Sequence, residues 1–347
     1  MRELFATVGL PELVAAIIVV ALNAYVLMAG ADFGGGVWDL LASGSRRENQ
    51  RSLIANSIGP VWEANHVWLI VVVVMLFTAF PQAFSVLGTL LHIPLTLMLI
   101  GIVMRGSAFV FRSYGSRART TRNRWGAAFS IASLVTPIVL GMVIGAIATG
   151  SLGDAASKLG QGSTFGEVYV APWFGEFPLA VGLFALSLFA FLAAVYLTVE
   201  ARDELLRDDF RARALGAAAA VFVSAGIALL IAQRDAPRVA AGVSGAPWSL
   251  VLHLCTAAAA ITAILALWRR AFRLARVAAA AQVSLILWGW ALSQYPYIIP
   301  TRLAIADAAA PPITLRLLLI GLGVGGAILI PSLRYLFRTF AGRAADL

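Results

Sequence analysis

The chain has 347 residues, of which 61% are apolar and 12% are charged, with a formal net charge of +9. Soluble domains carry about 25% charged residues, because their exteriors need polar groups to face water. The composition therefore excludes a soluble enzyme and a disordered chain, and it predicts an integral membrane protein of a single membrane domain, residues 1–347.

Nine apolar runs are long enough to cross a hydrocarbon core about 30 Å thick, which takes about 20 helical residues. Turn-forming residues separate several of them, as in Phe80-Pro81 and Pro311-Pro312. We therefore expect an all-α fold of about nine transmembrane helices, at residues 10–41, 57–80, 82–111, 125–150, 174–199, 214–233, 249–268, 274–294 and 314–337.

Basic residues alternate between the two sides of this layout. The odd-numbered connections and the C-terminus hold 20 of the 26 Arg and Lys residues, whereas the N-terminus and the even-numbered connections hold 6. Because positive residues gather on the cytoplasmic side, we expect the N-terminus outside and the C-terminus in the cytoplasm. The same asymmetry explains the net charge without a nucleic-acid partner.

Three acids lie at membrane depth: Asp32, Asp39 and Glu63. Ionisable groups are costly there, so each is a candidate functional residue. Asp32 and Asp39 are seven residues apart and share one helix face. Asp39 is near the predicted cytoplasmic end, where solvation alone would satisfy it; Asp32 is deeper, which favours either proton movement or a buried structural pair.

The second apolar run opens with a polar cluster at residues 62–68. Glu63 and His66 are three residues apart, a spacing that permits a hydrogen-bonded or proton-sharing pair. The competing interpretation is that these two groups satisfy each other structurally while Trp62 and Trp68 anchor the helix at the membrane interface.

Arg105 ends the third run, with Arg112 two turns further along. Such arginines either reach lipid phosphates or pair with a buried acid. The three histidines, His66, His92 and His253, lie on three different spans, which disfavours a haem b held by this chain alone. The sequence predicts no metal site.

Several motifs together resemble subunit II of the cytochrome bd-type quinol oxidases, including their cyanide-insensitive relatives. The specific one is NSIGPVWEANHVWLI at residues 56–70. The others are AGADFGGG at 29–36, LHIP at 91–94, RGSAFVFR at 105–112 and QYPY at 294–297. Their order and spacing extend the resemblance over residues 20–300.

The resemblance implies two four-helix bundles plus one peripheral helix. It implies a haem-free subunit of a complex that oxidises quinol and reduces dioxygen to water in the cytoplasmic (inner) membrane of a bacterium or archaeon. In that family the haems, b and d, and the quinol site belong to subunit I, so this chain alone is not expected to be catalytic. Subunit II supplies acids to a cytoplasmic proton path; a structural quinone or lipid and a small accessory subunit are further expected partners.

Carried over by position, Asp32 matches the second acid of the family's Asp-Gly-Phe-Asp motif, and Glu63 matches the Asp of its Trp-Asp-Gly-Asn motif. Ala29 and Val110 replace acids of the family, and His66 stands where Glu or Gln is usual. The proton path therefore either runs differently here or is absent. The proton-path candidates are Glu63, Asp32, His66 and Asp39, and the structural or interface candidates are Trp62, Asn65, Trp68, Arg105, Arg112, Gln294 and Tyr295.

Two other classes of protein compete with this reading. A secondary transporter would use the same buried acids for proton coupling, although matching halves with paired broken helices are not evident. A stand-alone b-type cytochrome would need a pair of histidine ligands; no helix carries two histidines, which leaves only a His66/His92 pair across neighbouring helices, and packed single histidines are the favoured interpretation.

Overall fold

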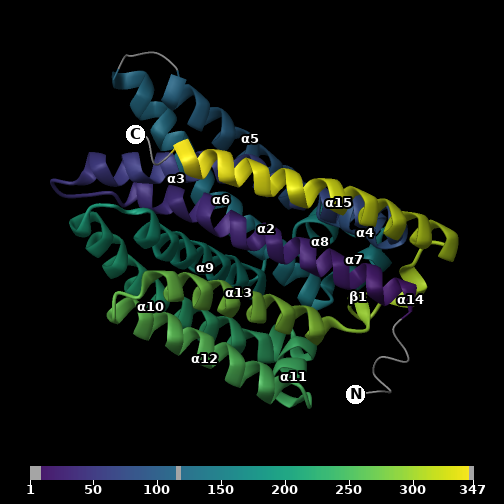
Figure 1. Ribbon diagram of the computed structural model, residues 1–347. Coiled ribbons are helices and arrows are strands. Elements are labelled where there is room, and N and C mark those ends of the chain that lie inside the picture. Colours follow the sequence, from purple (N-terminus) through teal and green to yellow (C-terminus); the bar gives the residue numbers. More distant parts are fainter. Residues whose placement is uncertain (1–8, 115–118, 344–347) are drawn as a thin grey trace.

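The computed structural model consists almost entirely of long helices that lie side by side along one direction (Figure 1). It describes the backbone of residues 9–114 and 119–343, and the side chains of 9–57, 64–111 and 124–335. The N-terminal and C-terminal halves each contribute one group of helices.

The first group surrounds the long N-terminal helix, because α2 packs against α3 and α6, and α5 packs against α6. Its helices are α2 (Leu10–Leu40), α3 (Arg47–Ala79), α4 (Pro81–Leu90), α5 (His92–Tyr114) and α6 (Arg119–Thr149).

The second group is built around α9, which packs on α10 and α13 and also on α2 and α6 of the first group. Its helices are α9 (Glu176–Glu200), α10 (Glu204–Asp235), α12 (Ser249–Trp268) and α13 (Phe272–Gln294). The last helix, α15 (Pro312–Arg343), lies along the outside against α2 and α3. The all-α architecture expected from the sequence is thus confirmed.

Short elements close the ends of the long helices. They are α7 (Ser151–Lys158), α8 (Phe165–Tyr169), α11 (Pro237–Gly245), α14 (Ile305–Ala308) and a two-stranded hairpin of β1 (Tyr297–Ile299) and β2 (Leu303–Ala304). Helix α8 starts with a capping box, in which the Thr164 hydroxyl accepts from the Glu167 N–H and the Glu167 carboxylate accepts from the Thr164 N–H. The Glu167 carboxylate accepts hydrogen bonds from both the backbone N–H and the hydroxyl of Thr164, and these two bonds hold the pKa of Glu167 below its usual value.

Eight of the described helices are long and apolar enough to cross a membrane. A ninth span arises only if residues 64–79 of α3 and helix α4 are taken as one unit, and these two are bent by 118°. The single span expected over residues 82–111 is wrong, since the chain breaks at Leu91 and forms α4 and α5 as separate helices. Hydropathy could not predict this break, because residues 82–111 are mostly apolar and hydropathy carries no information on the direction of the backbone.

Arginine-rich connections meet at one end of the molecule, which we call the arginine-rich end. There Arg46, in the α2–α3 connection, donates to Asp209 of α10 through Nε at 2.8 Å, and Gln50 Nε2 donates to the same carboxylate at 2.9 Å. Arg213 of α10 donates to Gln50 Oε1 at 2.8 Å. These contacts link the two helix groups by polar bonds where the apolar core ends.

Candidate functional site

Asp32 on α2 and Arg105 on α5 form a buried charge pair, with side chains that are 0% and 3% exposed. Arg105 Nη2 lies 2.6 Å from Asp32 Oδ1 and donates to the Asp32 backbone carbonyl at 2.7 Å. Its Nε donates to Ser133 Oγ at 2.9 Å. Of the two contacts considered for Arg105, the structure shows the one with a buried acid, and that acid is Asp32.

Two aromatic rings complete the surroundings of this guanidinium. The Arg105 Cζ atom lies 4.9 Å from the ring centre of Phe33 and 4.8 Å from that of Phe129. Aromatic faces attract a cation most strongly when water is excluded. The positive charge is thus held by a carboxylate, a carbonyl, a hydroxyl and two ring faces, which fixes its position from several directions.

Glycines in α2 allow this arrangement. A Cβ atom on Gly34 would overlap the backbone carbonyl of Phe189 on α9, and one on Gly36 would overlap the Ser133 side chain on α6. Without side chains at these positions, α2 can lie directly against both helices. The glycine run therefore sets the depth at which Asp32 meets Arg105 and Ser133.

Asp39 continues the polar contacts toward the arginine-rich end. It is 2% exposed; its Oδ1 lies 3.7 Å from Arg51 Nε, and its Oδ2 accepts from the Ser130 hydroxyl at 3.5 Å. The expectation that solvent alone satisfies Asp39 is therefore wrong, because helix α6 packs over this face of α2 and shields the Asp39 side chain from solvent. Arg51 is 23% exposed, so it connects the buried acid to the surface.

Tyr25 continues the same face of α2 in the other direction. Tyr25, Asp32 and Asp39 follow one another at seven-residue intervals and are all buried. At 1.5 Å per residue they span about 21 Å of a hydrocarbon core about 30 Å thick. We call these three residues, together with the polar groups that contact them or their partners, the polar column; these groups are Arg51, Arg105, Ser130 and Ser133.

Two members of the column have unused hydrogen-bonding capacity. Within the described part of the chain, no group hydrogen-bonds to the Tyr25 hydroxyl or, in favourable geometry, to the Asp32 carboxylate oxygens, despite the close Arg105 charge. Buried polar atoms are normally satisfied by protein or by ordered water. Tyr25 and Asp32 therefore retain the capacity to hydrogen-bond with a further polar group.

The polar cluster of α3 is described only in part, because the side chains of Trp62 and Glu63 lie outside the described residues. Asn65 is fully buried, and neither amide atom has a hydrogen-bond partner among the described groups. The indole N–H of Trp68 is likewise buried without a described acceptor, and His66 is half-buried. The pairing expected between Glu63 and His66 stays a prediction.

The remaining candidates lie away from the column. Gln294 ends α13 and is buried, whereas Tyr295, which precedes a cis proline, is 60% exposed. His92 contacts the Thr89 carbonyl through Nδ1 at 2.8 Å and packs its ring on Tyr169. The described residues contain no cluster of three metal-binding side chains, and the Arg112 side chain is outside them.

Sequence reasoning missed Tyr25, Arg51, Ser130 and Ser133. A signal existed for three of them: Ser130 and Ser133 are three residues apart in an apolar run, and Tyr25 precedes Asp32 by the interval that separates Asp32 from Asp39. Polar residues that recur on one face of an apolar helix indicate a polar contact inside a bundle.

Comparison with known proteins decides the family. The sequence model of the family described as cytochrome bd terminal oxidase subunit II matches residues 10–340. The chain belongs to this family. It is thus a subunit of a quinol oxidase complex, an oxidoreductase of the respiratory chain, and the transporter reading receives no support.

Individual relatives agree with this assignment. The chain is 25% identical over 326 residues, 91% of each chain, to a putative cytochrome bd menaquinol oxidase subunit II of Bacillus subtilis (strain 168). It is 31% identical over 131 residues to the cytochrome bd-I ubiquinol oxidase subunit 2 of Escherichia coli (strain K12), covering 38% of this chain and 34% of that protein. A bd oxidase structure from Geobacillus thermodenitrificans shares the fold, with a TM-score of 0.77, 22% identity and coverage of 95% and 98%.

Proposed function

We propose that this subunit is haem-free, that it supports a larger haem-bearing subunit I in the cytoplasmic membrane of a bacterium, and that its polar column conducts protons from the arginine-rich end. The observation that carries the proton proposal is the alignment of Asp39, Asp32 and Tyr25 along one buried helix face. The substrate of the complex is a quinol. Because the relatives' names include both menaquinol and ubiquinol, we propose only the chemical class of the substrate and not the particular quinol.

Asp39 is the entry group in this proposal. It is buried, yet Arg51 links it to the surface, and the Ser130 hydroxyl beside it can both accept and donate a proton. The distance from Asp39 to Asp32 along α2 is about 10 Å. Asp32 is balanced by Arg105, so it acts in this proposal as a fixed charge beside the proton path.

The family acids missing from this sequence do not interrupt the column. Ala29 is fully buried among the apolar side chains around Phe33, and Val110 is 42% exposed on the outer face of α5. Neither belongs to the set of contacts that joins Asp39, Asp32 and Tyr25. The proposed route therefore depends on groups that this chain retains.

Replacing Asp39 by Asn is expected to lower quinol oxidase turnover of the assembled complex about tenfold, which corresponds to about 1.4 kcal/mol in the activation barrier. Haem content should stay normal, since Asn keeps the shape and the hydrogen bond from Ser130. Steady-state oxygen consumption measures the effect, with Asp154→Asn, at an exposed position of α7, as the control. Turnover equal to the unmodified complex would remove Asp39 from the path.

Glu63 is tested in the same assay. We expect Glu63→Gln to lower turnover while haem content stays normal, because a neutral amide cannot exchange a proton. His66→Gln, which restores the residue type usual in the family, is expected to be nearly neutral. Unchanged turnover of Glu63→Gln would leave Glu63 with a structural role only.

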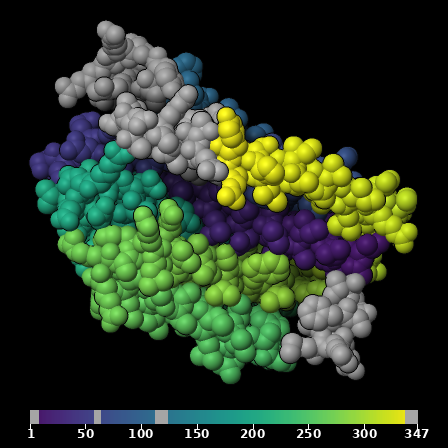
Figure 2. Space-filling model, viewed as in Figure 1, coloured from purple at the N-terminus to yellow at the C-terminus, as the bar shows by residue number. Residues whose placement is uncertain are grey.

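Subunit I is proposed to pack against α15. Of the eight candidate spans, α15 is the least covered: 6% of its most apolar stretch is buried, against 17–61% for the others. Figure 2 shows it along the surface beside α2. Gly321 and Gly325 are one turn apart, and a Cβ on either would meet open space, so a partner helix can approach closely.

A bulky residue on this face is expected to weaken the complex. Gly325→Leu should reduce the subunit I that co-purifies with a tagged subunit II at least severalfold, because the added side chain holds the partner helix away. Gly216→Leu on α10, also exposed with open space around it, is the control. Equal recovery of subunit I in both variants would place the contact elsewhere.

A further inference from the structure

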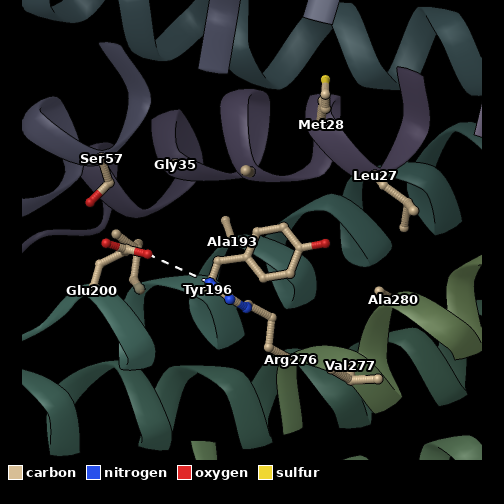
Figure 3. A pocket seen from close by; sticks show the side chains of 12 residues that line it. Leu27, Met28, Gly35, Ser57, Ala193, Tyr196, Glu200, Arg276, Val277 and Ala280 are labelled. Atoms are coloured by element: carbon tan, nitrogen blue, oxygen red, sulfur yellow. Dashed lines mark ion pairs between the residues drawn. The ribbon is translucent and has the colours of Figure 1, made fainter. Parts of the chain in front are cut away.

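A cavity of about 560 Å³ separates α2 from α13, with α9 as its floor (Figure 3). Its walls are mainly apolar, and Ser57 of α3 closes one side. It shares no residue with the polar column. The lining residues used below are Met28, Ala193, Tyr196, Glu200, Arg276 and Ala280.

Polar groups gather at one end of the cavity. Glu200 is the last residue of α9 and Arg276 lies in the first turns of α13, so both are at the arginine-rich end. In Figure 3, Glu200 and Ser57 lie on one side, and the Tyr196 ring extends across the cavity with its hydroxyl directed away from Glu200. The apolar walls, including Met28 and Ala280, continue from there into the span.

The two charged groups interact weakly with each other. Arg276 Nη1 is 3.7 Å from Glu200 Oε1, beyond hydrogen-bonding distance, and the side chains are 47% and 52% exposed. Exposed ion pairs of this kind contribute about 0–1 kcal/mol. Each group therefore retains capacity for another partner, and a ligand that offers a charge to each can replace their mutual contact at little cost.

We propose that this cavity binds a zwitterionic membrane phospholipid, with its phosphate on Arg276, its ammonium group on Glu200 and the upper part of one acyl chain between α2 and α13. A guanidinium matches a phosphate with paired N–H donors, and a carboxylate matches an ammonium group. The rim carries one charge of each sign, so it complements a phosphoethanolamine head better than a purely anionic head. The neutral carbonyls of a quinone head can accept from Arg276, but a quinone offers no cation to Glu200.

The shape of the cavity agrees with an amphiphile that enters from the membrane surface. The polar end lies where α9 ends and α13 begins, at the level of the headgroups, and the apolar part lies at acyl-chain depth. Cavities that bind organic ligands have volumes of about 300–1,000 Å³ and are mostly apolar with a few placed polar groups. The occupant is thus inserted lengthwise, head outward.

The test uses the intact oxidase complex, delipidated in mild detergent and then incubated with phosphatidylethanolamine, phosphatidylglycerol or a quinone, each at equal concentration. Native mass spectrometry counts the bound molecules. The unmodified complex should retain phosphatidylethanolamine in preference to the other two. Arg276→Gln is expected to weaken its retention about tenfold, whereas Arg273→Gln, an exposed arginine on the same helix, should leave it unchanged.

Two further variants separate the roles of the charges and the cavity. Glu200→Gln should abolish the preference for phosphatidylethanolamine over phosphatidylglycerol. Ala280→Phe, which fills the apolar part and leaves both charges in place, should prevent retention; the melting temperature of each variant checks that it is folded. Retention unaffected by Arg276→Gln, equal retention of both phospholipids by the unmodified complex, or a quinone as the retained molecule would overturn the proposal.

Discussion

Arg105→Leu is expected to lower the free energy of unfolding of this subunit by about 3–5 kcal/mol, the cost of leaving a buried charge without its partner. Asp32 is fully buried, and Arg105 is its only described counter-ion. The substitution also removes the donor to Ser133 and the cation between the rings of Phe33 and Phe129. Loss of assembled complex, and a lower melting temperature of what remains, measure the effect.

A double variant distinguishes charge from shape at this site. Adding Asp32→Asn to Arg105→Leu removes the uncompensated charge, so most of the lost stability should return. Arg234→Leu is the control: Arg234 is 66% exposed and pairs with Glu176 and Asp235 at the surface, so its loss should leave the melting temperature nearly unchanged. If Arg105→Leu alone were as stable as the unmodified chain, the pair would not hold these helices together.

The double variant also tests the proton proposal. Restored stability and haem content with low turnover would mean that the Asp32 charge serves proton movement. Restored turnover would mean that the pair is needed only for packing. This one variant therefore distinguishes the two roles that the sequence leaves open for Asp32, proton movement and a structural pair, because assembly and turnover are measured on the same sample.

Gly34→Ala is expected to lower the free energy of unfolding by roughly 3 kcal/mol, the upper part of the range for overpacking. The new Cβ would overlap the carbonyl of Phe189, which is backbone and cannot rotate aside. Helix α2 would have to move away from α9, and this movement would also shift Asp32 relative to Arg105. Thermal unfolding of the purified complex, monitored through the dissociation of its subunits, measures the loss of stability.

Two glycines provide the comparison. At Gly30 the nearest atoms belong to the Leu192 side chain, which can change rotamer, so Gly30→Ala should cost less than Gly34→Ala. At Gly88 on α4 a Cβ meets open space, so Gly88→Ala should be neutral or stabilise by about 0.4–1 kcal/mol. Equal effects at Gly34 and Gly88 would show that close contact between α2 and α9 is not required.

The candidate site could be predicted from the sequence only as a set of residues. Asp32, Asp39 and Arg105 stand out because charges are rare in apolar runs. Their partners could not be deduced: Arg105 is 73 residues from Asp32, and the sequence offered lipid phosphate as an equally reasonable contact. Asp39 was expected to be solvated, and only the position of α6 shows that Ser130 and neighbouring side chains cover it.

By itself the sequence determined the membrane location, the all-helical class and the family, because each depends on local properties: the apolarity of a run, the residues that end it and the order of short motifs. The tertiary structure decided the rest: the break between α4 and α5, the Asp32–Arg105 pair, and the cavity beside Arg276. The physical reason is that the free energy of transfer of a helix into a bilayer is the sum of contributions from its individual residues. The partner of a buried charge depends instead on which helices, distant in the chain, lie side by side in the folded protein.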